Sequence, residues 1–235
     1  SDRVKVMDVD ASKVYKNCDE YRRTVIMVEA DDKVSYGVDF FHVLGGNDHL
    51  YSFHSQSDDI TPISGLGDMT EQPTYEAENG DLIGTYAGPD VKYGPDPNSV
   101  NSEKYPKGYT WLKDVRTFGS IDKDFTVEYK VKDWRNALSE KKDIRLRVTM
   151  LGEEAADEVS FATALPQFAN SASNKDVSID YMLVRRKGAN LDSTFTTVFE
   201  PYEAGNKYIE KIEKVSMERG ASEKPGMNDS FGAVK

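Results

Sequence analysis

The side chains of this sequence best suited to chemistry near neutral pH are three histidines and one cysteine. His42, His49 and His54 lie close together, while Cys18 stands apart from them. Histidine titrates near neutrality and serves as a general acid, a general base or a metal ligand. A lone cysteine forms no internal disulfide, and no histidine is near Cys18 in the sequence to activate it as a nucleophile. The histidine segment is therefore the first candidate for a site.

All three histidines lie in a predicted β-hairpin. Two runs that alternate between apolar and polar residues, Val34–Leu44 and His49–Ser55, flank the turn sequence Gly-Gly-Asn-Asp at 45–48. Since successive side chains of a strand point to opposite faces, His49 shares its face with Tyr51. His54 lies on the other face of the same strand.

The division of the histidines between two faces argues against a three-histidine metal site. A zinc ion needs three or four nitrogen, sulfur or oxygen ligands that converge at about 2 Å. His49 with Asp48 could contribute to such a site, but the spacing fits no zinc motif. We predict no metal site and expect the histidines to hydrogen-bond within the sheet. General acid or base catalysis by one of them is the alternative.

The rest of the chain predicts further strands and hardly any helix, because a period of two recurs between short polar turns. The additional strand candidates are Val4–Val9, Tyr21–Ala30, Tyr109–Phe118, Phe125–Val131, Ile144–Leu151, Glu158–Ala164, Ser178–Arg186, Ser193–Glu200 and Lys207–Val215. Asp133–Lys141 is either a short helix or a turn. Many strands joined by short turns predict an all-β fold, a sandwich or a barrel. We expect an antiparallel, multi-stranded β-sandwich, which the family resemblance given below implies to be supersandwich-like.

Residues 1–235 are predicted to form a single β-sandwich region, because the sequence contains no internal repeat and no clean linker. The chain opens on Ser1 rather than Met and ends on Phe231–Lys235, which has the pattern of a strand just beginning. We therefore expect an excerpt of a longer chain, with a tail at 216–235 made of a loop and the start of a strand. The segment Tyr86–Gly108 is expected to be a loop, either mobile or in contact with substrate.

The composition is that of a folded, acidic protein. Apolar residues make up 38 % of the chain and charged residues 30 %, which excludes a disordered chain. The net charge of −11 argues against nucleic acid and an anionic membrane as partners, and no apolar run reaches the roughly 20 residues that span a bilayer. A local basic cleft could still bind an acidic polysaccharide. The 13 tyrosines suit sheets, and exposed aromatic rings also suit sugar binding.

A series of segments, taken in chain order, resembles one known family. These segments are Tyr21–Thr24, Val38–Gly46, His49–His54, Gly84–Val91, Gly108–Leu112, Ile144–Leu151, Tyr181–Gly188 and Ser193–Tyr202. In this order they resemble the carboxy-terminal β-rich portion of heparinase II/III-like proteins, a group of polysaccharide lyases and uncharacterised relatives. The resemblance covers most of the chain, from about Tyr21 to Tyr202.

The resemblance implies a lyase whose catalytic residues lie outside this chain. In that family a helical amino-terminal toroid packs against the β-sandwich, and the polysaccharide lies between them. The reaction is β-elimination at a uronic acid: a base removes the C5 proton, an acid assists departure of the C4 oxygen, and the carboxylate is neutralised. Residues of the toroid and of a His-x-His segment, which also helps to bind a metal, perform these steps. The chain has neither, so we assign it no catalytic residue, no metal ligand and no cofactor of its own; a metal ion belongs to the full-length family context.

Some residues could still line a polysaccharide cleft. The candidate substrate-binding residues are His49, Tyr51, His54, Arg185 and Arg186. Arginine recognises carboxylates through two parallel hydrogen bonds, and one member of each pair, Arg22–Arg23 and Arg185–Arg186, is expected to face inward. Structural ion pairs with Asp and Glu are the alternative. Relatives tend to have arginine where this sequence has His42, so the role of that position stays open.

Three functions fit these observations. The first is the β-sandwich portion of a heparinase II/III-like polysaccharide lyase, inactive alone, whose partners are an acidic polysaccharide and the missing toroid of the same parent protein. The resemblance implies a periplasmic or extracellular location for it. The second is a non-catalytic carbohydrate-binding module, suggested by the tyrosines of Tyr86–Trp111. The third is a purely structural module, so the sequence leaves open whether the chain belongs to an enzyme.

Overall fold

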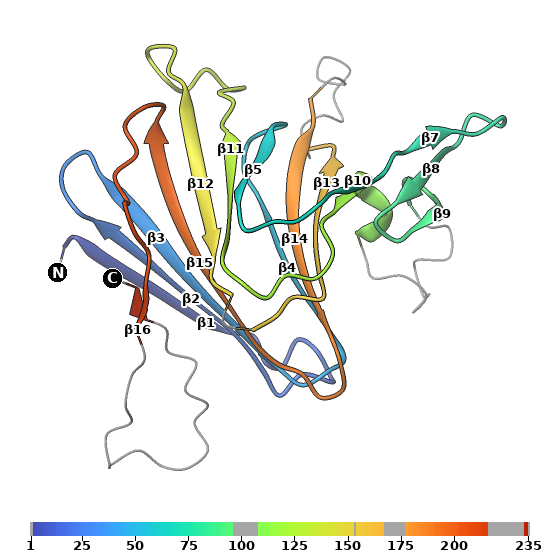
Figure 1. Ribbon diagram of the computed structural model, residues 1–235, viewed down its shortest axis with the longest axis horizontal. Coiled ribbons are helices and arrows are strands. Elements are labelled where there is room, and N and C mark those ends of the chain that lie inside the picture. The colour runs from blue at the N-terminus through green and yellow to red at the C-terminus, as the bar shows by residue number, and fades with distance from the viewer. Residues whose placement is uncertain (1, 96–107, 153, 167–176, 216–232, 235) are drawn as a thin grey trace.

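The computed structural model describes residues 2–95, 108–152, 154–166, 177–215 and 233–234, and these residues are mostly β-strand. Two antiparallel sheets pack face to face around a shared core. The prediction of an all-β antiparallel sandwich is therefore confirmed. Figure 1 shows the strands of both sheets fanning apart from the lower end of the molecule. The single helical element of the described ranges is the 3-10 turn η1, Tyr109–Trp111.

The first sheet, sheet A, has seven strands in the order β1-β2-β3-β15-β12-β11-β5. Their bounds are Val4–Asp10 for β1, Glu20–Glu29 for β2, Ser35–Leu44 for β3, Asp192–Glu203 for β15, Ile144–Met150 for β12, Phe125–Lys130 for β11 and Ile60–Ser64 for β5. In β11 buried and half-buried residues alternate strictly, because one face packs on the core and the other meets solvent. The terminal strand β1 is exposed along its whole length.

The second sheet, sheet B, follows the path β4-β14-β13-β10-β8-β7, with β6 paired to β10 and β9 paired to β8. The bounds are Asp48–His54 for β4, Ile179–Lys187 for β14, Glu158–Ala164 for β13, Lys113–Thr117 for β10, Leu82–Thr85 for β8, Tyr75–Glu76 for β7, Thr70–Gln72 for β6 and Gly88–Lys92 for β9. Because β4 stands at the end of this path, one of its edges faces away from the sheet. A separate two-stranded sheet joins β16, Lys214–Val215, to β17, Ala233–Val234.

Several segments differ from their predicted structure. The predicted strand Tyr109–Phe118 is η1 followed by β10, and only the last two residues of Lys207–Val215 form a strand. Asp133–Lys141 is not a helix, because the carboxylate of Asp133 accepts the N–H groups of Ala137 and Leu138 in a turn, at 2.8 and 2.9 Å.

The short strands between residues 60 and 92 were not predicted, since each carries too few alternations to stand out. Within the predicted loop Tyr86–Gly108, the part up to residue 95 contains β9, and residues 96–107 lie outside the described residues. Most of the predicted tail, 216–232, lies outside them as well.

The predicted histidine hairpin is wrong in its pairing. Both strands form, but β3 pairs with β2 and β15 in sheet A, whereas β4 pairs with β14 in sheet B. Gly45 and Gly46, at φ 91° and 84°, turn the chain from one sheet to the other. The connection between β14 and β15 runs alongside this turn. The Gly45 N–H donates to the Leu191 carbonyl at 2.7 Å, and the Leu191 N–H donates to the Gly46 carbonyl at 3.0 Å. A two-stranded ribbon thus folds over the end of the sandwich.

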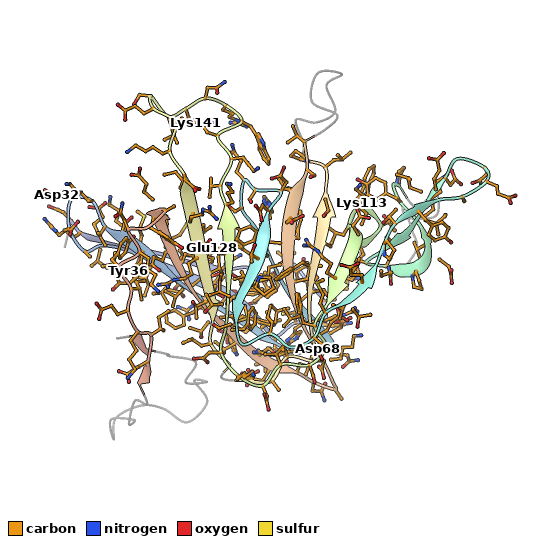
Figure 2. All side chains as sticks on the ribbon, turned by 45° about the horizontal axis from the view of Figure 1, so that its top comes forward. Asp32, Tyr36, Asp68, Lys113, Glu128 and Lys141 are labelled. Carbon is orange, nitrogen blue, oxygen red and sulfur yellow. The ribbon has the colours of Figure 1, made fainter. Side chains whose placement is uncertain are left out.

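The predicted directions of the side chains on this ribbon are confirmed. Phe41, Val43 and Tyr51 lie in the main core between the sheets. Leu50, one residue before Tyr51, packs against a second apolar cluster on the opposite face of sheet B. That cluster consists of Leu112, Val115, Ala162, Ala164, Ile179 and Leu183. Figure 2 shows the side chains crowded between Tyr36 of β3 and Lys113 of β10, which lie toward opposite ends of the molecule.

Candidate functional site

A crevice of about 360 Å³ opens beside β4, the last strand of sheet B. This volume lies within the range of small-molecule sites. Its lining comes from the segment 11–19, from β2, β3 and β4, from the turn at 45–47 and from η1. Aromatic rings dominate the walls: Tyr21 lies 5.1 Å from Tyr15 and 5.0 Å from Phe41, between ring centroids. Tyr109 of η1 also lines the crevice.

His49 lines this crevice, and one nitrogen of its ring has no hydrogen-bond partner among the described residues. Its imidazole is buried, and Nε2 lies 2.5 Å from the carbonyl oxygen of Gly45. A carbonyl only accepts hydrogen bonds, so Nε2 carries the proton and Nδ1 of the neutral ring is an acceptor. Nδ1 is buried without a hydrogen-bond partner among the described residues. An unsatisfied buried polar atom costs about 1–3 kcal/mol, so a hydrogen-bond donor that reached this nitrogen would be stabilised.

The rim of the crevice includes Asp48 and Tyr109, and Arg185 lies behind both of them. Its Nε–H donates to Oδ1 of Asp48 at 2.7 Å, and its Nη2 donates to the second carboxylate oxygen. The guanidinium also lies 5.7 Å from the ring centroid of Tyr109 and 5.9 Å from that of Tyr86. The hydrogen bonds to Asp48 raise the pKa of Arg185 further. Burial raises the pKa of Tyr109 to about 12, so its hydroxyl remains a hydrogen-bond donor across the physiological range.

Cys18 lines the same crevice but shows no sign of a nucleophile. Its thiol donates to the carbonyl of Glu20 at 2.8 Å. Burial raises the pKa of this thiol, and the protonated form is unreactive.

Of the five predicted substrate-binding residues, the structure places His49 in the lining of the crevice, and Arg185 contacts two lining residues, Asp48 and Tyr109. Tyr51 instead lies in the core, where its hydroxyl donates to Oδ2 of Asp39 at 3.1 Å. Arg186 is also buried: its Nη1 donates to the Thr194 carbonyl at 3.0 Å, and its guanidinium lies 4.2 Å from the ring centroid of Phe195.

His54, the fifth predicted residue, is exposed on the outer face of sheet B. Its ring lies 4.6 Å from that of Tyr181, between centroids. In each arginine pair one side chain reaches the core: Arg23 pairs with the buried Asp39, and Arg186 is buried itself. Arg22 and Arg185 pair with Asp8 and Asp48 on the opposite faces of their strands. The expectation that one member of each pair faces inward is confirmed.

His42 lies outside the crevice and has a structural role. Its Nε2 is 2.7 Å from Oδ1 of Asp192, and its Nδ1 is 3.3 Å from Oε1 of Glu20. These contacts link β3 to β15 and to β2. The expected hydrogen bonding of a histidine within the sheet is confirmed here.

The aromatic lining residues Tyr15, Tyr21, Phe41 and Tyr109 were not selected by sequence reasoning. The alternation of β2 could have placed Tyr21 on the face of Arg23, because the two lie two residues apart. No local signal could have shown that this face meets β4.

The described residues do not complete the metal site that the family resemblance implies. His49 has the arrangement of a metal-binding histidine, one ring nitrogen on a backbone carbonyl and the other free. However, no group of three or more His, Cys, Asp or Glu side chains able to hold a metal ion is found among the described residues.

A larger hollow, about 800 Å³, lies at the loop between β11 and β12, around the labelled Lys141 of Figure 2. Its loop residues 133–143 are mostly exposed, and Lys132 and Lys142 form ion pairs with Asp58 and Glu203. It offers no buried polar atom without a partner among the described residues, so the crevice is the stronger candidate.

Comparison with known proteins leaves the family open: neither the family models nor the curated proteins contain a match to this chain. In the ranges that the structure describes, no helix is long and apolar enough to cross a membrane.

Proposed function

We propose that this chain is the β-sandwich portion of a heparinase II/III-like polysaccharide lyase, and that the crevice beside β4 forms one wall of its polysaccharide cleft. The observation that carries the proposal is the buried, unpartnered Nδ1 of His49 among aromatic walls. A sugar ring can pack its C–H groups on the tyrosine rings and donate a hydroxyl hydrogen to Nδ1. The family-like segments include β3, β4, β14 and β15, the strands of the ribbon beside the crevice.

The crevice supplies binding groups but lacks part of what β-elimination requires. Nδ1 of His49 can accept a proton, and the Tyr109 hydroxyl can donate one. A cation must also neutralise the uronate, but Arg185 is already paired with Asp48. We infer that the neutralising group and the principal base and acid come from the toroid of the parent protein, so that the isolated chain binds polysaccharide without cleaving it.

The binding part of this proposal is tested with a substitution that removes only the free nitrogen. In His49→Gln the side-chain amide can still donate to the Gly45 carbonyl, but its acceptor oxygen is bonded to Cδ rather than to Cγ and so does not take the position of Nδ1. In calorimetric titrations with hexasaccharides of galacturonate, glucuronate-containing hyaluronan and heparin, we expect at least one probe to bind. His49→Gln should weaken that binding about tenfold, as the loss of one hydrogen bond implies. His54→Gln, on the opposite face of the same strand, is the matched control. Equal affinity of His49→Gln and the unmodified chain would contradict the proposal.

The catalytic part is tested by following the ultraviolet absorbance of the unsaturated product. The isolated chain should bind and not turn over, whereas a parent protein that includes the toroid should cleave. Robust turnover by the isolated chain would show that its own residues suffice. A parent protein that binds without cleaving would favour the second candidate, a non-catalytic carbohydrate-binding module, which the same aromatic crevice supports.

The proposal has consequences for the parent protein. Its reading frame should contain an upstream helical segment with a His-x-His sequence near its end. Its partners would be an acidic polysaccharide and this toroid, and its location would be periplasmic or extracellular, where such polysaccharides occur.

A further inference from the structure

A second concave surface, which we call the outer groove, lies on the outer face of sheet B. Its volume is about 430 Å³, and its lining includes Leu50, Ser52, Tyr93, Trp111, Tyr181 and Leu183. Leu50 and Tyr109 line both this groove and the crevice, so the two surfaces adjoin along one edge. The groove does not include His49 or Arg185 among its lining residues, and the proposed function makes no use of it.

Trp111 is the exposed ring of the outer groove. Its relative solvent exposure is 45 %, although it lies on a sheet face that also carries an apolar cluster. The Tyr93 ring meets it edge to face, at 5.5 Å between centroids and 75° between planes. This geometry is the one that aromatic pairs prefer, and it holds the indole in one orientation. An indole that is held in place and still exposed offers a flat surface for a ligand.

The described residues that line the outer groove carry no charged side chain. Among its described residues none is Asp, Glu, Lys, Arg or His, and its polar side chains are the hydroxyls of Ser52 and of tyrosines such as Tyr181. The crevice, by contrast, is bordered by the charged pair Asp48–Arg185. The described residues of the groove offer no cation to pair with an anionic ligand, and the chain has a net charge of −11. The chemistry that matches the groove is a flat, neutral, hydroxyl-rich ring.

We propose that the outer groove is a separate binding site for a neutral pyranose residue of a glycan. The C–H groups of the ring stack on the negative face of the Trp111 indole. The hydroxyls of Ser52 and Tyr181 exchange hydrogen bonds with the ring hydroxyls, and Leu50 and Leu183 line the apolar part of the groove. This site is independent of the elimination chemistry and of His49.

The test uses neutral hexasaccharides of β-glucan, xylan and mannan as probes, with hexagalacturonate as the acidic comparison. The chain has two tryptophans, and Trp134 packs against the apolar cluster beside the groove. In a Trp134→Phe background, the remaining fluorescence reports Trp111 alone. A saturable change with at least one neutral probe is expected, and a weaker or absent change with hexagalacturonate.

Calorimetry then compares variants for the neutral probe that binds. Trp111→Ala should lose at least tenfold in affinity, Trp111→Phe should retain part of it, and Ser52→Ala and Tyr181→Phe should each lose several-fold. Tyr75→Ala removes an exposed ring of sheet B outside the groove and should change nothing. Circular dichroism verifies that each variant is folded.

The inference is overturned if no neutral probe binds at low-millimolar concentration, if Trp111→Ala binds as well as the parent chain, or if hexagalacturonate binds the groove as tightly as the neutral probes. These outcomes are separate from those of the proposed function, because that test uses acidic probes and His49→Gln. His49→Gln should leave the neutral-probe affinity unchanged.

Discussion

Arg185 and Asp48 are joined by two parallel hydrogen bonds, although the strand register places Asp48 opposite Lys187 and Arg185 opposite Leu50. The pair is therefore diagonal across β4 and β14. A bidentate arginine–carboxylate pair is strong and geometrically specific, and this one carries the guanidinium to the rings of Tyr86 and Tyr109. It holds the rim of the crevice in place while cancelling its own charge.

The same substitution should affect mainly stability at Arg186 and mainly ligand binding at Arg185. Arg186→Met removes a buried guanidinium that donates to the carbonyls of Thr194 and Glu154, and it should lower the free energy of unfolding by about 2–4 kcal/mol. Arg185→Met breaks a bidentate pair in which the Arg185 side chain is 17 % exposed, so it should cost less, about 1–2 kcal/mol, and it should also weaken binding of acidic hexasaccharides. Urea denaturation and calorimetric titration measure the two effects. Equal destabilisation by both substitutions would contradict the assignment of Arg185 to the rim.

Arg23 should be essential for the burial of Asp39. The Asp39 carboxylate is fully buried and accepts hydrogen bonds from Arg23 at 2.9 and 2.6 Å and from the Tyr51 hydroxyl. Arg23→Ala leaves this charge unpaired, and the half-exposed position of Arg23 lets water compensate in part. We expect a loss of about 2–3 kcal/mol in the free energy of unfolding. Arg22→Ala, next to it on the opposite face and in an exposed pair with Asp8, is the matched control and should have little effect.

A side chain should destabilise the protein more at Gly45 than at a glycine in an open turn. A Cβ at Gly45 would lie 2.9 Å from the carbonyl oxygen of Asn17, and its φ is 91°. Gly45→Ala should therefore cost about 2–4 kcal/mol, the sum of left-handed strain and overpacking. Gly80, at φ 81° with no atom within 4 Å of a Cβ, should show only the strain, about 1–2 kcal/mol. Denaturant unfolding of the two alanine variants gives the comparison, and an equal loss would show that the inter-sheet turn can move away from segment 11–19.

The free energy of unfolding should decrease as the pH rises above about 10, which is the unperturbed pKa of tyrosine. Burial raises the pKa of Tyr109 to about 12 and that of Tyr202 to about 12, and it raises those of Tyr51 and Tyr86 as well. Below pH 10 both folded and unfolded chains keep these protons. Above it the unfolded chain loses protons that the folded chain retains, so unfolding is favoured progressively.

Thermal unfolding between pH 8 and pH 11 measures this dependence, and tyrosinate absorbance of the chain in denaturant gives the unfolded reference. Tyr109→Phe should flatten the decline in melting temperature. A melting temperature that is constant across this interval would contradict the burial of the tyrosines.

The sequence alone determined the strands and the direction of each side chain. Phe125, Val127 and Tyr129 alternate with polar residues, and all three are buried in the core. The same alternation divided His49 and Tyr51 from His54. A strand has a period of two whatever its neighbours are, so this information is local.

Only the tertiary structure decided which strands pair and which residues meet. The runs Val34–Leu44 and His49–Ser55 fit a hairpin as well as they fit two sheets, because alternation says nothing about the partner strand. Pairing of β4 with β14 and of β3 with β15 depends on contacts far apart in the sequence. These contacts bring Tyr109 and Cys18 to the crevice of His49 and leave Tyr51 in the core.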